Sequence, residues 1–228
     1  LRNKKLNKMI LEFEAGQKIY NPQSGSILNI VYVDRPFAGY LYAGAALNLL
    51  YNSENNLKLS LQTGTIGPSA LAKEAQELMH NVVGFYEING WQWQVNNELA
   101  INAAAEYNHL INRSTSGKLD FTANSYINIG NTFSGAGAGI MFRTGAINPL
   151  YNSASSQSRL SKNTPKKEVG NEFFFYAKPM LHFIAYDATI QGGLFIQDKG
   201  PVVFDTKPVV FSQQAGAIYS DRKSTRLN

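Results

Sequence analysis

The sequence predicts an all-β protein, an antiparallel transmembrane β-barrel that carries one short helix around residues 69–83. Several long segments alternate apolar and polar residues with a period of two. Charged residues make up only 16% of the chain, and no run of about 18 apolar residues predicts a membrane-spanning helix. A soluble β-sandwich also alternates, but its outward faces normally carry more charge than the Ser, Thr, Asn and Gln found here.

Length and composition limit the alternatives. The 228 residues suit one all-β domain, and we expect residues 1–220 to form a single barrel domain with incomplete first and last strands. Residues 221–228 are expected to be a non-native or disordered tail. The absence of cysteine excludes a disulfide framework. The net charge of +5 comes partly from the chain ends, and the sequence lacks the interleaved basic and aromatic residues of nucleic-acid binders. We therefore expect no binding to nucleic acid. We also expect the protein to be a monomer.

Four windows carry the strand prediction most clearly. Each has one apolar and one polar face over a length that suits a tilted pass through a bilayer, with the apolar face toward lipid and the polar face inside. The windows are residues 58–64, 98–108, 118–131 and 172–187. The same reasoning adds strand candidates at residues 8–20, 40–51, 135–145 and 209–219.

Irregular positions interrupt this pattern. Pro179 lies inside the fourth window and predicts a bulge or a local break in pairing, because proline lacks a donor for the ladder. Residues 51–56 and 112–118 read as tight hairpins and residues 148–171 as a long polar loop, and barrels have short turns at one end and long loops at the other. Aromatic residues near strand ends are candidates for interfacial girdles, namely Tyr20, Tyr40, Tyr42, Tyr51, Trp91, Trp93, Tyr107, Phe133 and Tyr151.

Residues 67–80, GPSALAKEAQELMH, have helical spacing inside this β pattern. Ser69 is a plausible N-cap and Gly84 ends the helix. The opposite face of the helix from its apolar stripe holds Gln76 and His80, one turn apart, so the amide could orient the imidazole. The other interpretation is an amphipathic plug or lid helix with a merely solvated His80. The apolar stripe comprises Leu71, Ala75, Leu78, Met79 and Val82.

Other ionisable residues favour structural roles. His182 lies on the polar face of a strand, where an interior hydrogen-bonded histidine is the more common outcome, and His109 is expected at an interface. Glu98, Glu106 and Asp120 are expected in a satisfied polar network rather than as an acid and base pair. The sequence contains no nucleophile elbow, zinc-protease motif or P-loop.

Four segments together resemble, in order and approximate spacing, the outer-membrane lipid A deacylase family. The resemblance spans roughly Gly16 to Gly216. It rests on the four segments taken together, since any one of them alone would be weak evidence for the family. It implies a twelve-stranded barrel in the outer membrane, of which this chain would hold fewer strands, and removal of the 3′-linked acyloxyacyl chain from the lipid A of lipopolysaccharide. The segments are DRPFAGYLYAG from Asp34, GTIGPSALAKEAQELMHNVVGF from Gly64, GWQWQVNNE from Gly90 and FDTKPVVFSQQAG from Phe204.

The resemblance also assigns roles. His80 matches the catalytic histidine, a general base on water that is assisted by calcium. Gln76 is a second catalytic candidate because of its helical spacing from His80, not because of the resemblance. Glu87 is the acid that follows and the candidate metal ligand. Further site residues of the family, an Asn-Asp pair and a small hydroxyl residue, are expected upstream of Leu1. The alternatives are a non-catalytic pore or scaffold barrel and, less favoured, a soluble lipid-binding barrel.

Overall fold

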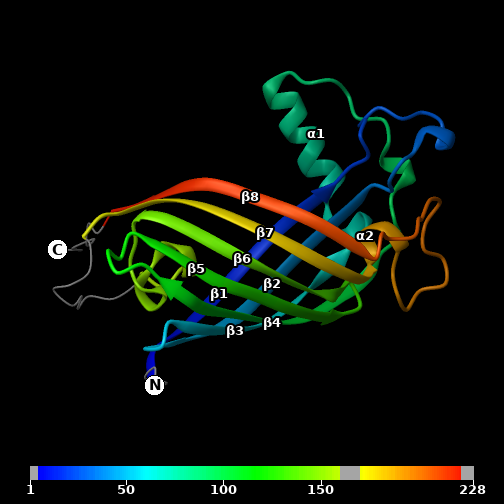
Figure 1. The fold of residues 1–228 in the computed structure, drawn as a ribbon. Coiled ribbons are helices and arrows are strands. Elements are labelled where there is room, and N and C mark those ends of the chain that lie inside the picture. The colour runs from blue at the N-terminus through cyan, green and yellow to red at the C-terminus, as the bar shows by residue number, and fades with distance from the viewer. Residues whose placement is uncertain (1–4, 160–169, 222–228) are drawn as a thin grey trace, which may run out of the picture.

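The computed structural model describes residues 5–159 and 170–221. In these residues eight antiparallel strands form one curled sheet in chain order, with β1 and β8 at its edges (Figure 1). This confirms the predicted all-β barrel architecture. The strands are β1 Leu6–Tyr20, β2 Ala38–Tyr51, β3 Asn55–Ile66, β4 Glu98–Arg113, β5 Leu119–Gly130, β6 Phe133–Ala146, β7 Glu172–Asp187 and β8 Val209–Ser220.

Helices are few and short. The helix α1 spans Ala72–Val83 and α2 spans Ala188–Gln191. Within the described ranges, none of the helices has both the length and the apolar character needed to cross a membrane. The single-turn 3-10 helices are η1 Ile30–Tyr32, η2 Pro68–Ala70, η3 Trp91–Trp93, η4 Leu150–Asn152 and η5 Ala154–Ser156.

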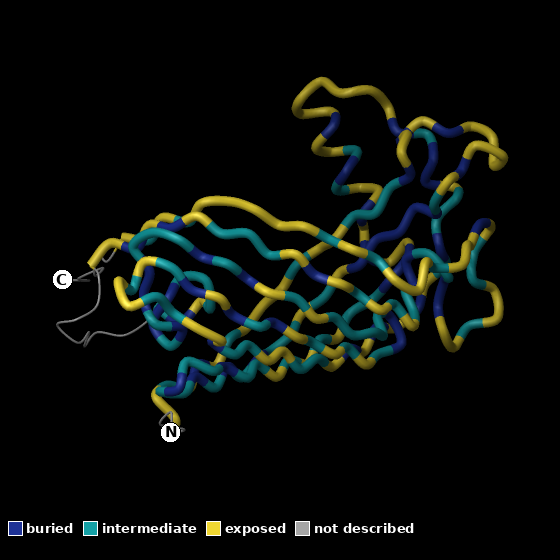
Figure 2. The backbone as a smooth tube through the Cα atoms, viewed as in Figure 1, coloured by how far each residue is buried: buried dark blue, intermediate teal, exposed yellow. Residues whose placement is uncertain are grey.

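The sheet has an apolar outer face and a polar inner face. Residues paired across strands share a face, and on the outer face Leu47 of β2 pairs with both Leu11 of β1 and Leu59 of β3. The side chains on this face are exposed along the wall (Figure 2). The inner face carries polar contacts such as the 2.7 Å ion pair between Lys58 and Glu12. The alternation predicted for the four windows is therefore confirmed, with apolar residues outward.

Pro179 interrupts one ladder without changing its register. The β6–β7 pairing stops at Gly139 with Met180 and resumes at Phe142 with Ala177, in the same register. On its other side Pro179 pairs with Gln213 of β8. The predicted local break is thus confirmed, whereas the irregularity that shifts the β6–β7 register lies elsewhere, at residues 134–135. The missing proline N–H explains the break.

The two ends of the sheet differ in their connections. The tight turns at residues 52–54 and 114–118 lie at the end where β1 begins and β8 ends, and the long connections 21–37, 67–97 and 188–208 lie at the opposite end, called here the loop end (Figure 1). The long connection that follows β6 leaves from the end with the tight turns, so the expected grouping of all long loops at one end is wrong. Residues 160–169 of that connection and 222–228 of the expected tail are outside the described residues.

The connection after β6 first folds into the interior of the curled sheet. The side chains of Arg143, Asp120 and Glu172 are fully buried there. Arg143 donates to Asp120 at 2.6 Å and to Ser153 at 2.8 Å, and Ser153 donates to Glu172 at 2.7 Å. Each of these three buried charges has a hydrogen-bond partner, so the network is satisfied. The folded connection fills this end of the interior. The network expected for Asp120 is confirmed.

Aromatic residues near the strand ends do not form the expected girdle. Tyr40 is fully buried and accepts a hydrogen bond from Asn102 at 3.1 Å on the inner face. Trp91 is also buried, with its ring centroid 5.1 Å from that of Phe37. Tyr107, by contrast, lies on the outer face and is 43% exposed. Successive side chains of a strand point to opposite faces of the sheet. The nearness of an aromatic residue to the end of a strand therefore does not predict whether its ring points inward or outward.

Candidate active site

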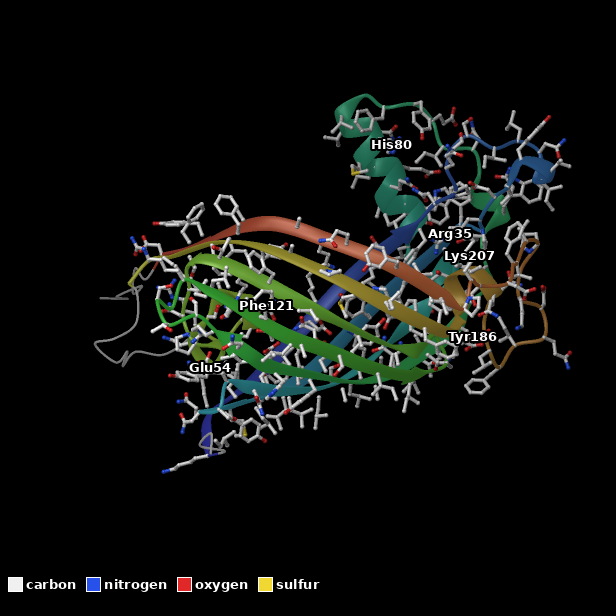
Figure 3. The ribbon with its side chains drawn as sticks, in the orientation of Figure 1. Arg35, Glu54, His80, Phe121, Tyr186 and Lys207 are labelled. Carbon is white, nitrogen blue, oxygen red and sulfur yellow. The ribbon has the colours of Figure 1, made fainter. Side chains whose placement is uncertain are left out.

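The helix α1 lies on the outer side of the wall at the loop end. Gln17 and Ile19 of β1 share the outer face of that strand with Leu11 and Phe13. Gln17 donates to the carbonyl of Ala70, immediately before the helix, at 2.5 Å. Figure 3 shows His80 on α1, outside the curled sheet. The helix is therefore not a plug inside the barrel.

Small residues allow the helix to approach the wall. A Cβ added to Gly39 on the outer face of β2 would lie 2.5 Å from the Cβ of Ala72, closer than real side chains allow. Ala72 packs with Phe37, Ile88 and Trp91 in a small buried core outside the sheet. This core fixes the start of α1 against the barrel, because dense packing leaves little room for rearrangement.

The start of α1 differs from the prediction. The helix begins at Ala72, and its N-cap is Leu71 in a left-handed conformation with φ of 55°. Ser69 lies in the preceding 3-10 turn, where its backbone N–H donates to the side-chain oxygen of Asn97 at 2.7 Å. Ser69 is thus not the helix N-cap, because the chain bends once more after it before the α-helix starts.

The buried face of α1 is its polar one. Gln76 is 7% exposed and His80 is 8% exposed, whereas Leu78 and Val82 are 66% and 77% exposed. A helix packed on a soluble core shows the opposite pattern. The interpretation of His80 as a merely solvated side chain is therefore wrong.

Backbone geometry fixes the imidazole of His80. Its Nδ1 lies 2.8 Å from the carbonyl oxygen of Tyr86. A carbonyl only accepts, so Nδ1 carries a hydrogen, and in the neutral imidazole Nε2 then presents its lone pair. The rings of Phe85 and Tyr86 contact the imidazole edge to face, at centroid distances of 5.4 and 5.3 Å. Histidine bases in hydrolases are commonly oriented through one ring nitrogen in this way, which leaves the other free to take a proton.

The chain reaches this arrangement through Gly84. This C-cap residue is left-handed, with φ of 71°, and the N–H of Phe85 donates to the carbonyl of His80 at 2.9 Å. The predicted end of the helix at Gly84 is confirmed. The reversal brings the carbonyl of Tyr86 back beneath His80, and this partner was missed at the sequence level because a backbone carbonyl has no residue-type signal.

The remaining candidates lie close in sequence but differ in environment. Gln76 does not hold the imidazole, since Tyr86 does. The Oε1 atom of Gln76 is buried and has no hydrogen-bond partner among the residues that the structure describes. Glu87 is exposed. Across residues 5–159 and 170–221, no group of three or more His, Asp or Glu side chains could hold a metal ion. One orphan amide oxygen suits calcium, which prefers oxygen ligands, but the described side chains alone do not complete a calcium site.

The other two histidines have structural partners. His182 lies on the inner face, with Nδ1 2.6 Å from the Tyr126 hydroxyl and Nε2 2.7 Å from the Ser212 hydroxyl. This confirms the expected hydrogen-bonded interior histidine. His109 contacts the side-chain oxygen of Asn55 at 2.7 Å, near the tight-turn end.

Polar contacts join the connections between strands at the loop end. Arg35 donates to the hydroxyl of Thr189 at 2.6 Å, which ties the connection after β1 to α2. Glu98 accepts from Asn131 at 2.5 Å and from the backbone N–H of Phe195 at 2.9 Å. These contacts confirm the polar network expected for Glu98.

Comparisons with known proteins agree with this architecture. A family model described as "Outer membrane protein LpxR" matches residues 2–227. The solved structure of LpxR from Salmonella typhimurium is similar in fold, with a TM-score of 0.75 and 24% sequence identity over 95% of this chain and 75% of that chain. A comparison with curated proteins found no match.

Proposed function

Because this chain belongs to the LpxR family of outer membrane proteins, we propose that it hydrolyses the 3′-linked acyloxyacyl ester of lipid A in the outer leaflet. The observation that carries the proposal is His80. Its imidazole is buried on a helix that stands outside the barrel and is held there by the carbonyl of Tyr86, where a lipid ester and water can meet. A side chain inside the barrel has no such access to lipid.

In the proposed reaction His80 acts as the general base. Its Nε2 takes a proton from water while the water oxygen attacks the ester carbonyl carbon. The tetrahedral intermediate then breaks its bond to the 3′ oxygen of the sugar, and the imidazolium returns the proton to that oxygen. Imidazole suits this exchange near neutral pH, and the Tyr86 carbonyl stabilises the imidazolium through Nδ1.

Gln76 is proposed as a second participant. Within residues 5–159 and 170–221 its buried Oε1 atom has no hydrogen-bond partner, which is costly unless something in the working enzyme satisfies it. An acceptor one helical turn from His80 could hold the second hydrogen of the attacking water and so orient the oxygen. This role places Gln76 in contact with a reactant rather than with the imidazole.

Calcium is proposed as the ion that supplies charge for the developing oxyanion. Oxyanion stabilisation is often the largest single catalytic contribution. Among the described residues, the exposed Glu87 carboxylate is the candidate ligand. It does not form a complete site by itself, and no proton transfer proposed above depends on the ion.

The test compares lipid A from cells that produce the unaltered protein, His80→Ala or His109→Ala. Mass spectrometry should find the 3′-deacylated product with the unaltered protein and with His109→Ala, since His109 contacts Asn55 near the opposite end of the strands. With the His80→Ala protein, the amount of 3′-deacylated product should fall about 10²- to 10⁴-fold, because this is the usual contribution of a general base to the rate. Equal deacylation by all three proteins would exclude His80 as the base.

A non-catalytic pore is the second candidate. The polar interior holds a cavity of about 380 Å³ lined by Lys18, Gln62, Glu106 and other residues. The buried network around Arg143 closes the interior toward the other end, which disfavours continuous conduction. Ion conductance across planar bilayers, with unchanged lipid A, would support the pore instead.

A further inference from the structure

The helix α1 presents an unusual surface to its surroundings. Its second half exposes an apolar stripe, defined here as Leu78, Met79, Val82, Val83 and the following Phe85, with exposures of 66, 51, 77, 53 and 62%. The only polar side chain exposed between residues 78 and 83 is that of Asn81. An apolar surface of this kind normally marks a partner.

The position of the stripe indicates which partner covers it. The first turns of α1 are anchored on the outer face of β1, through Gln17 and Ile19. On that same face Leu11 and Phe13 are 62% and 78% exposed, and in an outer membrane protein this face of the wall is covered by lipid. The stripe thus stands on the same side of the wall as a surface that lipid covers.

Charge along the helix agrees with this placement. The charged residues of α1 lie in its first half, where Lys73 and Glu77 approach to 3.8 Å, one turn apart and both partly exposed. The second half carries no charged side chain that points outward. An amphipathic helix at a membrane surface keeps its charged side chains toward water and its apolar side chains in lipid.

We propose that the apolar stripe of α1 is immersed in the acyl chains of the outer leaflet. The bilayer is then the partner of this helix, and lipid covers the side of it that the protein leaves exposed. The proposal rests on the outer-membrane location and not on the proposed hydrolysis. An inactive protein would still show it.

The chain offers a clean measurement, because it contains no cysteine. Single cysteines introduced as Met79→Cys and Val82→Cys would carry an environment-sensitive fluorophore in the full-length protein. The protein is reconstituted into phosphatidylcholine vesicles with or without brominated acyl chains, which quench fluorophores that touch them. Phe13→Cys on the outer face of β1 is the lipid-exposed reference, and Lys73→Cys on α1 is the matched control near water.

Immersion predicts that brominated lipid quenches labels at residues 79 and 82 at least half as strongly as the label at residue 13, whereas the label at residue 73 changes little. Quenching at residue 13 without quenching at residues 79 and 82 would overturn the proposal. Energy transfer between copies labelled at residue 82 that grows with protein density, in place of lipid quenching, would also overturn it, because a second copy would then cover the stripe.

Discussion

At the scale of single residues, burial decides which charged contacts matter. The ion pair between Arg143 and Asp120 is fully buried, with atoms 2.6 Å apart. The pair between Lys58 and Glu12 has nearly the same distance, 2.7 Å, but its side chains are 23% and 22% exposed. Water competes with the second pair and not with the first, so similar geometry should have different consequences for stability.

Arg143→Met is expected to lower the free energy of unfolding by about 3–5 kcal/mol, since it removes a main partner of a buried carboxylate. Lys58→Met is the matched control and should cost about 1 kcal/mol or less. Urea unfolding from phospholipid vesicles measures both. Equal losses would mean that burial does not distinguish the two pairs.

The catalytic candidate belongs to the same scale. The resemblance predicted His80 from its residue type and its motif, and this assignment stays a prediction until activity is measured. Its geometry could not be predicted, because the partner of Nδ1 is the backbone carbonyl of Tyr86. Any residue type can supply a carbonyl, so the sequence favoured the neighbouring Gln76 side chain instead.

At the scale of elements, the end of α1 determines where the imidazole is held. Gly84 takes a left-handed conformation that returns the chain toward His80. Gly117, in the hairpin between β4 and β5, has the same φ of 71°, and an added Cβ would meet nothing within 4 Å at either glycine. Replacing either glycine should therefore cost a similar amount of backbone strain. The two sites differ in their surroundings, since Gly84 ends the helix that carries His80 and Gly117 lies in a hairpin.

Alanine at either glycine should cost about 1–2 kcal/mol of backbone strain. Gly84→Ala shifts the Tyr86 carbonyl and is expected to reduce lipid A deacylation about tenfold, while Gly117→Ala leaves it within about twofold, since a tenfold rate change needs only about 1.4 kcal/mol. Initial rates on purified lipopolysaccharide provide the measurement. Equal rates for the two variants would show that the helix end does not position His80.

At the scale of the whole molecule, the curled sheet is apolar outside and polar inside. Leu61, in the middle of β3, points outward and is 60% exposed, while Ser60 beside it lines the interior cavity. Neighbouring residues on one strand thus face lipid and an aqueous interior. The same substitution made at each position therefore compares the cost of a charge facing lipid with its cost in the interior, on one and the same strand.

Leu61→Arg should destabilise the folded protein in vesicles by about 2–4 kcal/mol, the cost of a cation on the lipid face near the bilayer centre. Ser60→Arg should cost clearly less, because the cavity of about 380 Å³ has room and polar neighbours. The measurement is the folding free energy of each variant in phospholipid vesicles. A larger loss at Ser60 would contradict the assignment of the two faces.

The sequence by itself determined the strands and their sidedness. A period of two is a local property of each strand, and the scarcity of charge indicated that lipid, rather than water, covers the apolar face. The tight hairpins and the end of α1 at Gly84 were predicted for the same reason, since turn and cap signals depend on neighbouring residues.

Only the tertiary structure decided which face of α1 is buried and which partner holds His80. A helical period gives two faces but does not say which of them meets the protein, and the usual rule assumes water outside. Here the helix stands on the outer side of β1, so its polar face packs inward and its apolar face points outward. The inward folding of residues 147–158 likewise depends on charges that three separate strands supply, Asp120 of β5, Arg143 of β6 and Glu172 of β7.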